Sequence, residues 1–374
     1  MRILQFTLPH HPSMGGVYTG QEDFKNILNA PIVEVLPSNL RNQTTGDYQI
    51  KFSGIGFLEK YGVPTNIPSI MSNLQSLNVD LVIIHSLFHI HSLIGYWFAR
   101  KNDIPYLFVP HGTLDPYVFS YRKAQKSLWM SLVGQKLIDH SSAVICSTHR
   151  ESEKAATYLQ KANIEVCPWG IHTPDNLESS IWRHEIRTKL NISSERRLLI
   201  FLGRLNRVKR ALETALAFQK LKPEGWTFLL VGHPEETAIM KGIENICDGQ
   251  TIRYHPPVNS IDKWKFLAAA DAFVNLSCKE NFGYAIAEAA FMGLPILISD
   301  GVDTYPMLQS VGAADILSIN SESTLINGLN TFLNKPLPQL QEMGFKGRNF
   351  ALDNFTYDSF KHKLTSIVAK YAKS

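Results

Sequence analysis

The stretch KENFGYAIAEAAFMGLPILISDG, from Lys279 to Gly301, combines a helix-forming run with two carboxylates and an Asn-Phe-Gly step. It follows the apolar run AFVNLS and contains a second one, PILIS, which predicts a strand, a helix and a strand in succession. Glu288 lies among alanines and isoleucine, where a carboxylate without partners is costly to bury. The stretch therefore predicts an α/β sheet and a polar site at the start of its helix.

Short apolar runs of the same kind recur along the chain. Continuous runs of Val, Ile, Leu and Phe are typical of strands buried on both faces of a parallel sheet. Helix-like stretches such as RALETALAFQKL and DKWKFLAAA separate most of them, which favours an α/β fold with helices on both faces. The runs are RILQFTL, LVIIHS, PYLFVPH, AVICS, IEVCP, LLIFLG, TFLLVG, IRYHP, AFVNLS and PILISD.

This pattern occurs twice. A chain of 374 residues is long for a single core. The aperiodic segment CPWGIHTPD, Cys167–Asp175, predicts a linker. We expect a Rossmann-like domain over 1–172, a second over 173–353, and a C-terminal helix over 354–374 that packs back towards the first. Two such sheets facing each other across a cleft would bind ligands at the carboxyl ends of their strands.

The composition is that of a soluble globular protein, with 44% hydrophobic and 19% charged residues. A net charge of +4 is too small to indicate a nucleic-acid partner. The four cysteines lie far apart, which favours reduced thiols over disulfides or a zinc site. The first residues lack the layout of a signal peptide, and no apolar run is long enough to span a bilayer. These features predict a cytoplasmic protein.

The run LLIFLGRLNRVKR places two cations just after a predicted strand. Gly203 allows a tight turn, and Arg204 and Lys209 follow it on the loop and at the start of the next helix. Arg can bind two phosphate oxygens at once and Lys supplies a compact charge, so the pair suits a diphosphate. The alternative is a solvated basic loop, which is the reading we give to Arg207 and Arg210.

The opening stretch supplies complementary groups. We expect its helix to begin near Phe282 or Gly283, where unpaired amides and the helix dipole favour an anion. Glu280 lies just before the helix and can accept hydrogen bonds from hydroxyl groups; its alternative role is to stabilise the helix N-terminus by charge alone. Glu288 lies inside the helix. Two carboxylates on either side of a phosphate site suit a sugar nucleotide.

These two segments resemble the paired motifs of retaining glycosyltransferases of family 4, the glycosyl transferases group 1, which have the GT-B fold. The spacing between Glu280 and Glu288 is the hallmark of that family, and the resemblance covers most of residues 195–300. The segment departs from the family pattern at Asn281, where Ser, Gly or Pro is commoner, and at Arg210, where Gly is common.

The N-terminal half resembles the family less closely. The similar segments are MGG at Met14–Gly16, PHGTLDP at Pro110–Pro116, and CPWGIH. The resemblance implies that Gly15 and Gly16 form a loop over the donor phosphates and that His111 faces the donor sugar.

The resemblance also implies roles for the second half. Glu280 would bind hydroxyls of the donor sugar, Glu288 the ribose, and Arg204 and Lys209 the diphosphate. The strand end HPPV, His255 to Val258, would lie beside the base. The implied catalytic residues are Arg204, Lys209, Glu280 and His111, and the implied donor-binding residues are Gly15, Gly16, Arg204, Lys209, His255, Val258, Glu280, Asn281, Phe282, Gly283 and Glu288.

By the same resemblance no metal or other cofactor is needed, because two cations and a helix terminus can balance the diphosphate. The implied mechanism is a front-face reaction in which the leaving phosphate oxygen accepts the proton of the acceptor. UDP-glucose is the first expected donor and GDP-mannose the second. The expected acceptor is a saccharide or lipid-linked saccharide in the synthesis of a cell-surface or extracellular polysaccharide.

Two other function classes stay open at this point: a sugar-nucleotide epimerase on the same fold, and a non-catalytic protein that binds sugar nucleotides. The presence together of Arg204, Lys209, Glu280 and Glu288 favours the transferase. The sequence disfavours a dinucleotide oxidoreductase because the first strand leads into PHHPSMGG, which lacks a Gly-x-Gly-x-x-Gly turn.

Two further segments allow alternative interpretations. His85, His89 and His91 in HSLFHIH have a spacing that could suit a metal, but a loop lining the ligand site is the favoured reading. The segment Ser120–Leu137 is basic and aromatic at helical spacing. It predicts either a surface helix packed by Leu128, Trp129 and Leu132 or a peripheral contact with anionic lipid at the inner face of the plasma membrane.

Overall fold

The computed structural model describes residues 1–7, 15–37, 47–52, 74 and 78–372. The chain forms two compact units, one of Met1–Trp169 with Phe360–Ser374 and one of Gly170–Ser359. Both are α/β units built on a parallel sheet, so the predicted fold class of two Rossmann-like domains is confirmed.

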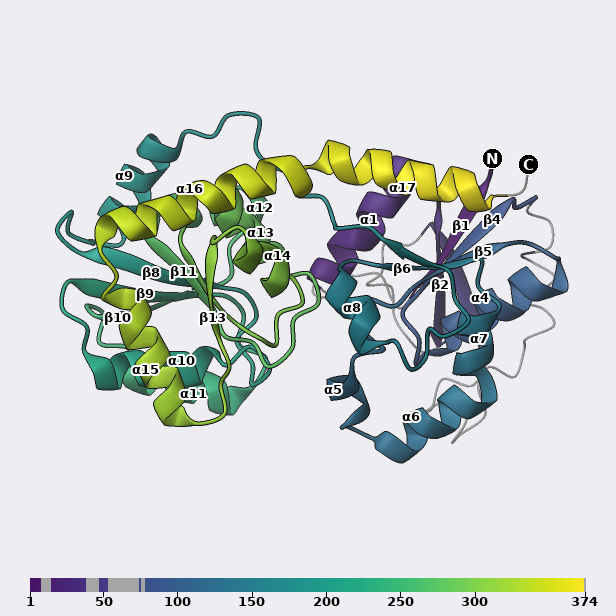
Figure 1. The fold of residues 1–374 in the computed structure, drawn as a ribbon, viewed down its shortest axis with the longest axis horizontal. Helices are drawn as coiled ribbons and strands as arrows, with labels where there is room; N and C mark the ends of the chain where they lie inside the picture. The colour runs from purple at the N-terminus through teal and green to yellow at the C-terminus, as the bar shows by residue number, and fades with distance from the viewer. Residues whose placement is uncertain (8–14, 38–46, 53–73, 75–77, 373–374) are drawn as a thin grey trace. The chain divides into compact units, whose positions relative to one another are not determined.

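The sheet of the first unit has seven parallel strands in the order β3-β2-β1-β4-β5-β6-β7 (Figure 1). Its central strands are buried along their whole length, which is why they are continuously apolar in sequence. The strands are β1 (Ile3–Thr7), β2 (Ile32–Pro37), β3 (Tyr48–Phe52), β4 (Leu81–His85), β5 (Tyr106–Val109), β6 (Ala143–Cys146) and β7 (Ile164–Val166).

The second unit has a six-stranded parallel sheet in the order β10-β9-β8-β11-β12-β13. Every apolar run quoted above lies on a strand of one of the two sheets. Sequence reading missed β2, β3 and β13, which lie at or beside a sheet edge and are less apolar. The strands are β8 (Arg197–Leu202), β9 (Trp226–Val231), β10 (Ile252–His255), β11 (Ala272–Asn275), β12 (Ile296–Ser299) and β13 (Ala314–Leu317).

Helices cover both faces of the second sheet. One face carries α10, α11 and α15, and the other carries α12, α13, α14 and α16 (Figure 1). Their apolar sides pack on buried strand residues such as Phe228 and Val274. These helices are α10 (Ala211–Leu221), α11 (Thr237–Ile246), α12 (Ser260–Ala269), α13 (Tyr284–Phe291), α14 (Tyr305–Ser310), α15 (Glu322–Leu333) and α16 (Leu337–Asn354), with α9 (Ser179–Lys189) preceding β8.

In the first unit, α17 (Tyr357–Tyr371) lies beside α1 (Gly16–Leu28) (Figure 1). Phe360 of α17 packs against Phe24 and Trp169, with ring centroids 5.9 and 5.6 Å apart. Lys370 adds an exposed ion pair with Glu165 at 2.8 Å. The C-terminal helix therefore completes the core of the first unit through burial of its aromatic face.

The remaining helices of the first unit follow β4, β5 and β6. They are α4 (Ile90–Lys101), α5 (Pro116–Phe119), α6 (Lys123–Trp129), η2 (Met130–Gly134), α7 (Gln135–Asp139) and α8 (His149–Lys154). No helix among the described residues is long and apolar enough to cross a membrane.

In each sheet the strand order reverses once, between β1 and β4 and between β8 and β11. The loops that leave the two strands at a reversal diverge to opposite faces and leave room for a ligand at the carboxyl edge. Gly15 follows β1, and His85 ends β4. Arg204 and Lys209 follow β8, and Glu280 follows β11. The topology therefore places four of the predicted site residues, Gly15, Arg204, Lys209 and Glu280, at these two reversals.

Candidate functional site

The loops after β8 and β11 are joined at the carboxyl edge of the second sheet. The amide of Cys278 donates to the carbonyl of Val208 at 2.7 Å. A Cβ atom added to Gly232, which follows β9, would lie 1.7 Å from the carbonyl oxygen of Gly203. Glycine at these turns lets the backbones approach so closely that the loops form one layer above the strand ends.

Arg204 is held by a carboxylate that follows β9. Its Nη1 donates to Oε1 of Glu235 at 2.6 Å, and the amide of Asn206 donates to Oε2 of the same residue at 2.6 Å. Burial opposes ionisation of Glu235, but these two hydrogen bonds outweigh it and lower its pKa. Arg204 is 48% exposed, so its guanidinium is both oriented and accessible.

Lys209 lies in the turn just before α10 and forms an ion pair with Glu280 from the β11 loop. Its backbone amide donates to Oδ1 of Asn206 at 3.0 Å, which fixes the turn. Its side chain is 14% exposed. Burial, and after it the positive charge of Arg204, lowers the pKa of Lys209 to about 7. A bound anion, added to Glu280, would therefore raise the pKa of Lys209 and favour its charged form.

The turn from Glu280 to Gly283 leads into α13. The amide of Glu280 donates to Gly301 O at 3.0 Å, and its carbonyl accepts from Asp303 N at 2.8 Å. Gly283 has φ +79°, and an added Cβ would lie 2.7 Å from Ile286 and 3.1 Å from Cγ of Glu280. Only glycine fits this turn without strain, because both the conformation and the space exclude a side chain.

The helix starts at Tyr284, one or two residues later than expected, with Gly283 as its N-cap. Ile286 and Ala287 donate to the carbonyl of Gly283, so the hydrogen-bond ladder and the positive end of its dipole begin there. The Phe282 ring is buried against Phe355 at 5.2 Å, so only the backbone of Phe282 is placed to bind an anion. Asn281 is partly buried beside it.

Glu288 is 4% exposed and forms an ion pair with Lys263 of α12. Burial raises the pKa of Glu288, and the charge of Lys263 opposes that rise. A carboxylate buried in apolar surroundings needs a partner, and for Glu288 this partner is a lysine on a neighbouring helix. The sequence held no signal for this pairing, because Lys263 and Glu288 lie on different helices.

His255 ends β10 at the same edge of the sheet. Its Nδ1 donates to the carbonyl of Pro256 at 2.8 Å, and its ring contacts Phe266 with centroids 4.6 Å apart. Val258 is partly buried. Both residues lie at the carboxyl edge that carries Arg204 and Lys209.

Arg210 has a left-handed backbone, with φ +51°, and it caps α10. Glycine is common at this position in the family because it adopts that conformation without strain. The presence of Arg210 in place of the common Gly therefore raises the conformational energy of the backbone at this turn. Arg207 is 73% exposed and pairs with Glu236 at 2.9 Å, which agrees with its reading as a solvated residue.

The predicted site residues Gly15, Gly16 and His111 lie in the first unit. Gly15 has φ +62° and precedes α1, which begins at Gly16; Met14 lies outside the described residues. His111 follows β5 with φ +49°, and burial lowers its pKa to about 4. Its Nε2 lies 2.8 Å from Nδ1 of His85.

The rings of His89 and His91 in HSLFHIH stack with centroids 6.0 Å apart, and the ring of His85 makes other contacts. His85 hydrogen-bonds to Gln5 and His111, while Nε2 of His91 donates to the backbone carbonyl of His85 at 2.5 Å. Burial lowers the pKa of His91 to about 3. Among the described residues, no three metal-binding side chains gather in one place.

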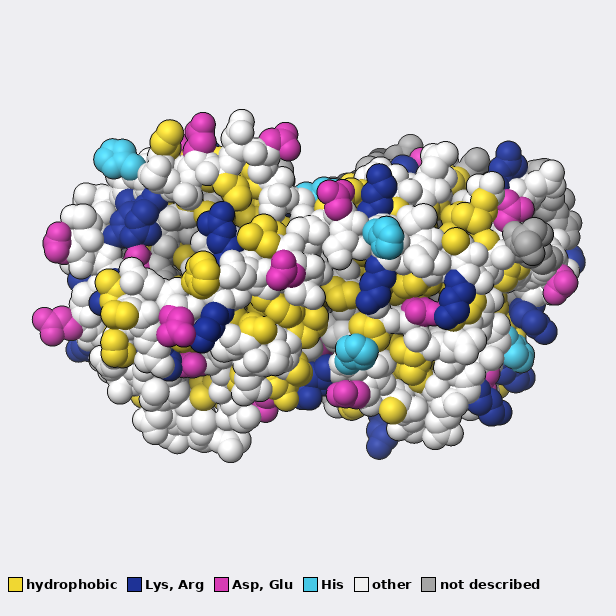
Figure 2. All heavy atoms as spheres, turned by 45° about the horizontal axis from the view of Figure 1, so that its top comes forward, with side chains coloured by type: hydrophobic (Ala, Val, Ile, Leu, Met, Phe, Trp, Pro, Cys, Tyr) yellow, Lys and Arg dark blue, Asp and Glu magenta, His cyan; other side chains and the backbone are white. Residues whose placement is uncertain are grey.

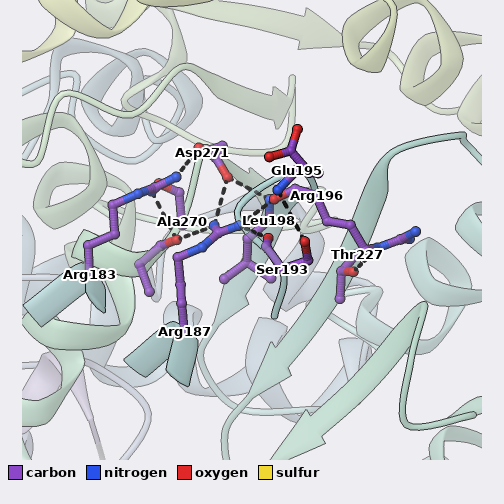
Figure 3. Close-up of polar contacts among 10 residues, drawn as sticks. Arg183, Arg187, Ser193, Glu195, Arg196, Leu198, Thr227, Ala270 and Asp271 are labelled. Carbon is purple, nitrogen blue, oxygen red and sulfur yellow. Dashed lines mark hydrogen bonds and ion pairs between the residues drawn. The ribbon is translucent and has the colours of Figure 1, made fainter. Parts of the chain in front are cut away.

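A second charge cluster lies at the amino edge of the second sheet (Figure 3). Asp271 accepts from Arg183 at 2.7 Å, from Arg187 at 3.2 Å and from the backbone amide of Leu198 at 2.7 Å. Arg187 also donates to the carbonyls of Ala269 and Ser193. These bonds attach α9 to the starts of β8 and β11, far along the strands from the loops that carry Arg204 and Glu280.

The sequence models of two protein families match this chain. Glycosyl transferases group 1 matches residues 183–350, and Glycosyltransferase Family 4 matches residues 37–174. Together the two matches span most of the chain, and the first contains Arg204, Lys209, Glu280 and Glu288.

Curated relatives are distant. D-inositol 3-phosphate glycosyltransferase of Mycobacterium ulcerans is 22% identical over 73% of this chain and 62% of its own length. The putative teichuronic acid biosynthesis glycosyltransferase TuaC of Bacillus subtilis is 28% identical over 54% of this chain and 48% of its own. These matches therefore span less than two thirds of either relative.

Solved structures share the fold across both units. Sucrose-phosphate synthase from Thermosynechococcus elongatus has a TM-score of 0.76 at 14% identity, covering 99% of this chain and 98% of the other. Anabaena HepE, solved with UDP and glucose, has a TM-score of 0.75 at 14% identity, covering 99% and 100%. Residues 183–350 therefore belong to the glycosyl transferases group 1 and residues 37–174 to Glycosyltransferase Family 4, and the chain has the two-domain GT-B fold.

Proposed function

We propose that the protein transfers a hexose from a nucleoside-diphosphate sugar to a saccharide or lipid-linked saccharide, with retention of configuration and without a metal. UDP-glucose is the first candidate donor, and the solved complexes of Anabaena HepE with UDP-glucose favour testing it first. The acceptor belongs to the synthesis of a cell-surface or extracellular polysaccharide in this proposal.

The contact between Lys209 and Glu280 is the observation that carries the proposal. It joins the two loops at the strand-order reversal, where a ligand with both anionic and hydroxyl groups would meet a cation and a carboxylate together. Arg204 supplies a second cation that Glu235 orients. Lys209 and Arg204 would stabilise the departing diphosphate, and Glu280 would accept hydrogen bonds from the sugar hydroxyls.

Binding measurements on two carboxylate variants test these assignments. Glu288→Gln is expected to weaken UDP and UDP-glucose alike, because the ribose is common to both ligands. Glu280→Gln is expected to weaken UDP-glucose about tenfold more than UDP, since only the intact donor has sugar hydroxyls. Calorimetry with both ligands measures the difference, and Glu236→Gln, on the neighbouring surface, is the control.

Equal losses of both ligands in Glu280→Gln would contradict its contact with the sugar. If the unmodified protein bound GDP-mannose and did not bind UDP-glucose, the donor assignment would move to the second candidate.

A membrane contact of Ser120–Leu137 is supported by its exposed side chains. The side chains of Tyr121, Leu128 and Leu132 are 75%, 60% and 62% exposed. The two leucines therefore do not pack the segment onto the core, as the interpretation of a packed surface helix expected. Lys123 and Lys136 lie on the same segment, and apolar groups mixed with cations suit an anionic lipid surface. The wider surface differs: on the face in Figure 2, positive and negative side chains are interspersed.

Sedimentation with vesicles tests this contact. The protein is expected to bind vesicles containing phosphatidylserine, and Leu128→Ser with Leu132→Ser is expected to weaken that binding several-fold. Substituting the exposed Phe345 of α16 by Ser is the matched control in the other unit. Equal binding of the double variant would remove the membrane contact from the proposal.

A further inference from the structure

A chain of side-chain hydrogen bonds leads from the backbone of the first unit to His111. Nε2 of Gln5, on the central strand β1, donates to the carbonyl oxygen of Ala30 at 2.8 Å. Oε1 of Gln5 lies 2.8 Å from Nε2 of His85, and Nδ1 of His85 lies 2.8 Å from Nε2 of His111. Gln5 and His85 are both fully buried, so no water competes for these groups.

The carbonyl of Ala30 fixes which atom is the donor and which the acceptor at each step of this series of hydrogen bonds. A carbonyl oxygen can only accept, so the amide nitrogen of Gln5 must face it and the amide oxygen must face His85. That oxygen also only accepts, so Nε2 of His85 carries a hydrogen. A neutral imidazole has one N–H, and a charged one would be costly in so buried a place. Nδ1 of His85 is therefore an acceptor, and Nε2 of His111 must donate to it.

His111 is held in place from other sides. Its ring centroid lies 5.7 Å from that of Trp169, and the amide of the next residue, Gly112, donates to the buried carboxylate of Glu151 at 2.7 Å. Nδ1 of His111 has no hydrogen-bond partner among the described residues. The lowered pKa of His111 means that its ring is neutral near pH 7.

We infer that Gln5 and His85 are positioning residues that fix His111 as its Nε2–H tautomer, so that Nδ1 is presented to the ligand as a hydrogen-bond acceptor. A lone pair at that position accepts a hydrogen bond from a hydroxyl group and repels a phosphate oxygen. The ligand group that His111 binds is therefore a hydrogen-bond donor, which in a sugar is a hydroxyl; its assignment to the donor sugar rests on the proposed function.

Nitrogen-15 NMR of the ligand-free full chain tests the tautomer directly, because long-range couplings distinguish a protonated ring nitrogen from an unprotonated one. The expected result is that both His85 and His111 carry their hydrogen on Nε2. A hydrogen on Nδ1 of His111, or a mixture of the two tautomers, would overturn the inference without reference to any variant.

Two substitutions at Gln5 separate the effect of its hydrogen bond to His85 from the effect of its packing. Gln5→Met keeps the volume but removes the acceptor, so His111 is expected to populate both tautomers. Gln5→Glu, whose carboxyl is protonated in this buried place, can donate to the carbonyl of Ala30 and accept from His85, so the Nε2–H tautomer of His111 is expected to return. His140→Phe is the control, since His140 bonds to Tyr96 at 2.9 Å outside this chain. A single unchanged tautomer in Gln5→Met would show that Gln5 does not set it.

Ligand titration of the unmodified protein separates this inference from the proposed function. UDP-glucose is expected to shift the Nδ1 resonance of His111, and UDP alone is expected to shift it much less. A larger or equal shift with UDP would contradict the assignment of His111 to the donor sugar. If neither ligand bound while the tautomer were as inferred, the proposed donor would be wrong and the positioning role of Gln5 and His85 would stand.

The kinetic expectation is that His85→Phe lowers kcat/KM for UDP-glucose about tenfold, the effect of one mispositioned hydrogen bond. The double variant with His111→Ala is expected to be no slower than His111→Ala alone, because both substitutions remove the same interaction. Additive losses would show that His85 acts independently of His111.

Discussion

The two ends of the second sheet each gather charged residues, yet the clusters differ in what their charges bind. At the amino edge, Asp271 is matched by two arginines and a backbone amide, and Arg187 by several carbonyls. At the carboxyl edge, Lys209 has a lowered pKa and Arg204 is half exposed. A charge cluster that is fully bonded within the protein stabilises the fold, whereas one that a ligand can still stabilise indicates a binding site.

The largest difference is expected on removal of the cations at the carboxyl edge. Arg204→Ala and Lys209→Ala should each lower turnover about a hundredfold or more, roughly 2.7 kcal/mol, because each removes a preorganised charge from the leaving group. Steady-state assays with thermal unfolding measure both effects, and unfolding is expected to change little. Arg207→Ala, an exposed arginine paired with Glu236, is the matched control. Near-normal turnover in both variants would contradict the diphosphate assignment.

The opposite outcome is expected at the amino edge. Asp271→Ala should lower the free energy of unfolding by about 2–3 kcal/mol, because Arg187 is buried and would lose its carboxylate partner. Donor affinity of the folded protein should stay the same. Chemical denaturation and calorimetry with UDP-glucose measure the two quantities. A loss of donor affinity with unchanged stability would reverse the roles given to the two edges.

Proton uptake sharpens the comparison further. Lys209 has a lowered pKa of about 7, and a bound diphosphate would raise it, so the lysine should gain a proton on binding. Uptake should therefore approach one proton at pH 8 and be close to none at pH 6, where Lys209 is already charged. Calorimetry in buffers of different ionisation enthalpy measures this quantity. Lys209→Arg, which stays charged at both pH values, should abolish the difference; if uptake persisted there, another group would be responsible.

The smallest expected effect concerns Arg210, a residue with a left-handed backbone that ends the segment GRLNRVKR just before α10. Arg210→Gly should raise the free energy of unfolding by about 0.5–1 kcal/mol, because glycine adopts this conformation without a Cβ clash. Chemical denaturation measures the change, and Lys222→Gly, also left-handed but at the far end of α10, should give a gain of similar size. A gain only at Lys222 would mean that the Arg210 side chain stabilises the site loop.

The sequence predicted much of the architecture because the central strands of parallel sheets are buried on both faces and leave continuous apolar runs. Ten such runs lie on strands of the two sheets, and the family resemblance is confirmed. The edge strands Tyr48–Phe52 and Ala314–Leu317 were missed because their sequences, YQIKF and ADIL, contain polar residues that interrupt an apolar run.

For the candidate site, sequence patterns indicated Arg204, Lys209, Glu280 and Glu288, because each lies in a motif with fixed local spacing. Their roles in binding and catalysis stay predictions. Glu235, Lys263 and Gln5 had no such pattern, and His85 was noted only within the segment HSLFHIH. Each lies far along the chain from the residue it contacts, so only the order of the strands brings the pair together.

By itself, then, the sequence determined the fold class, the family and the loops on which the chemistry is predicted, since these follow from local periodicity and short motifs. The tertiary structure decided which carboxylate orients Arg204, which lysine accompanies Glu288, and which tautomer His111 adopts. Those properties depend on hydrogen bonds between groups on different strands and on their burial, and neither is encoded in the spacing of residues along the chain.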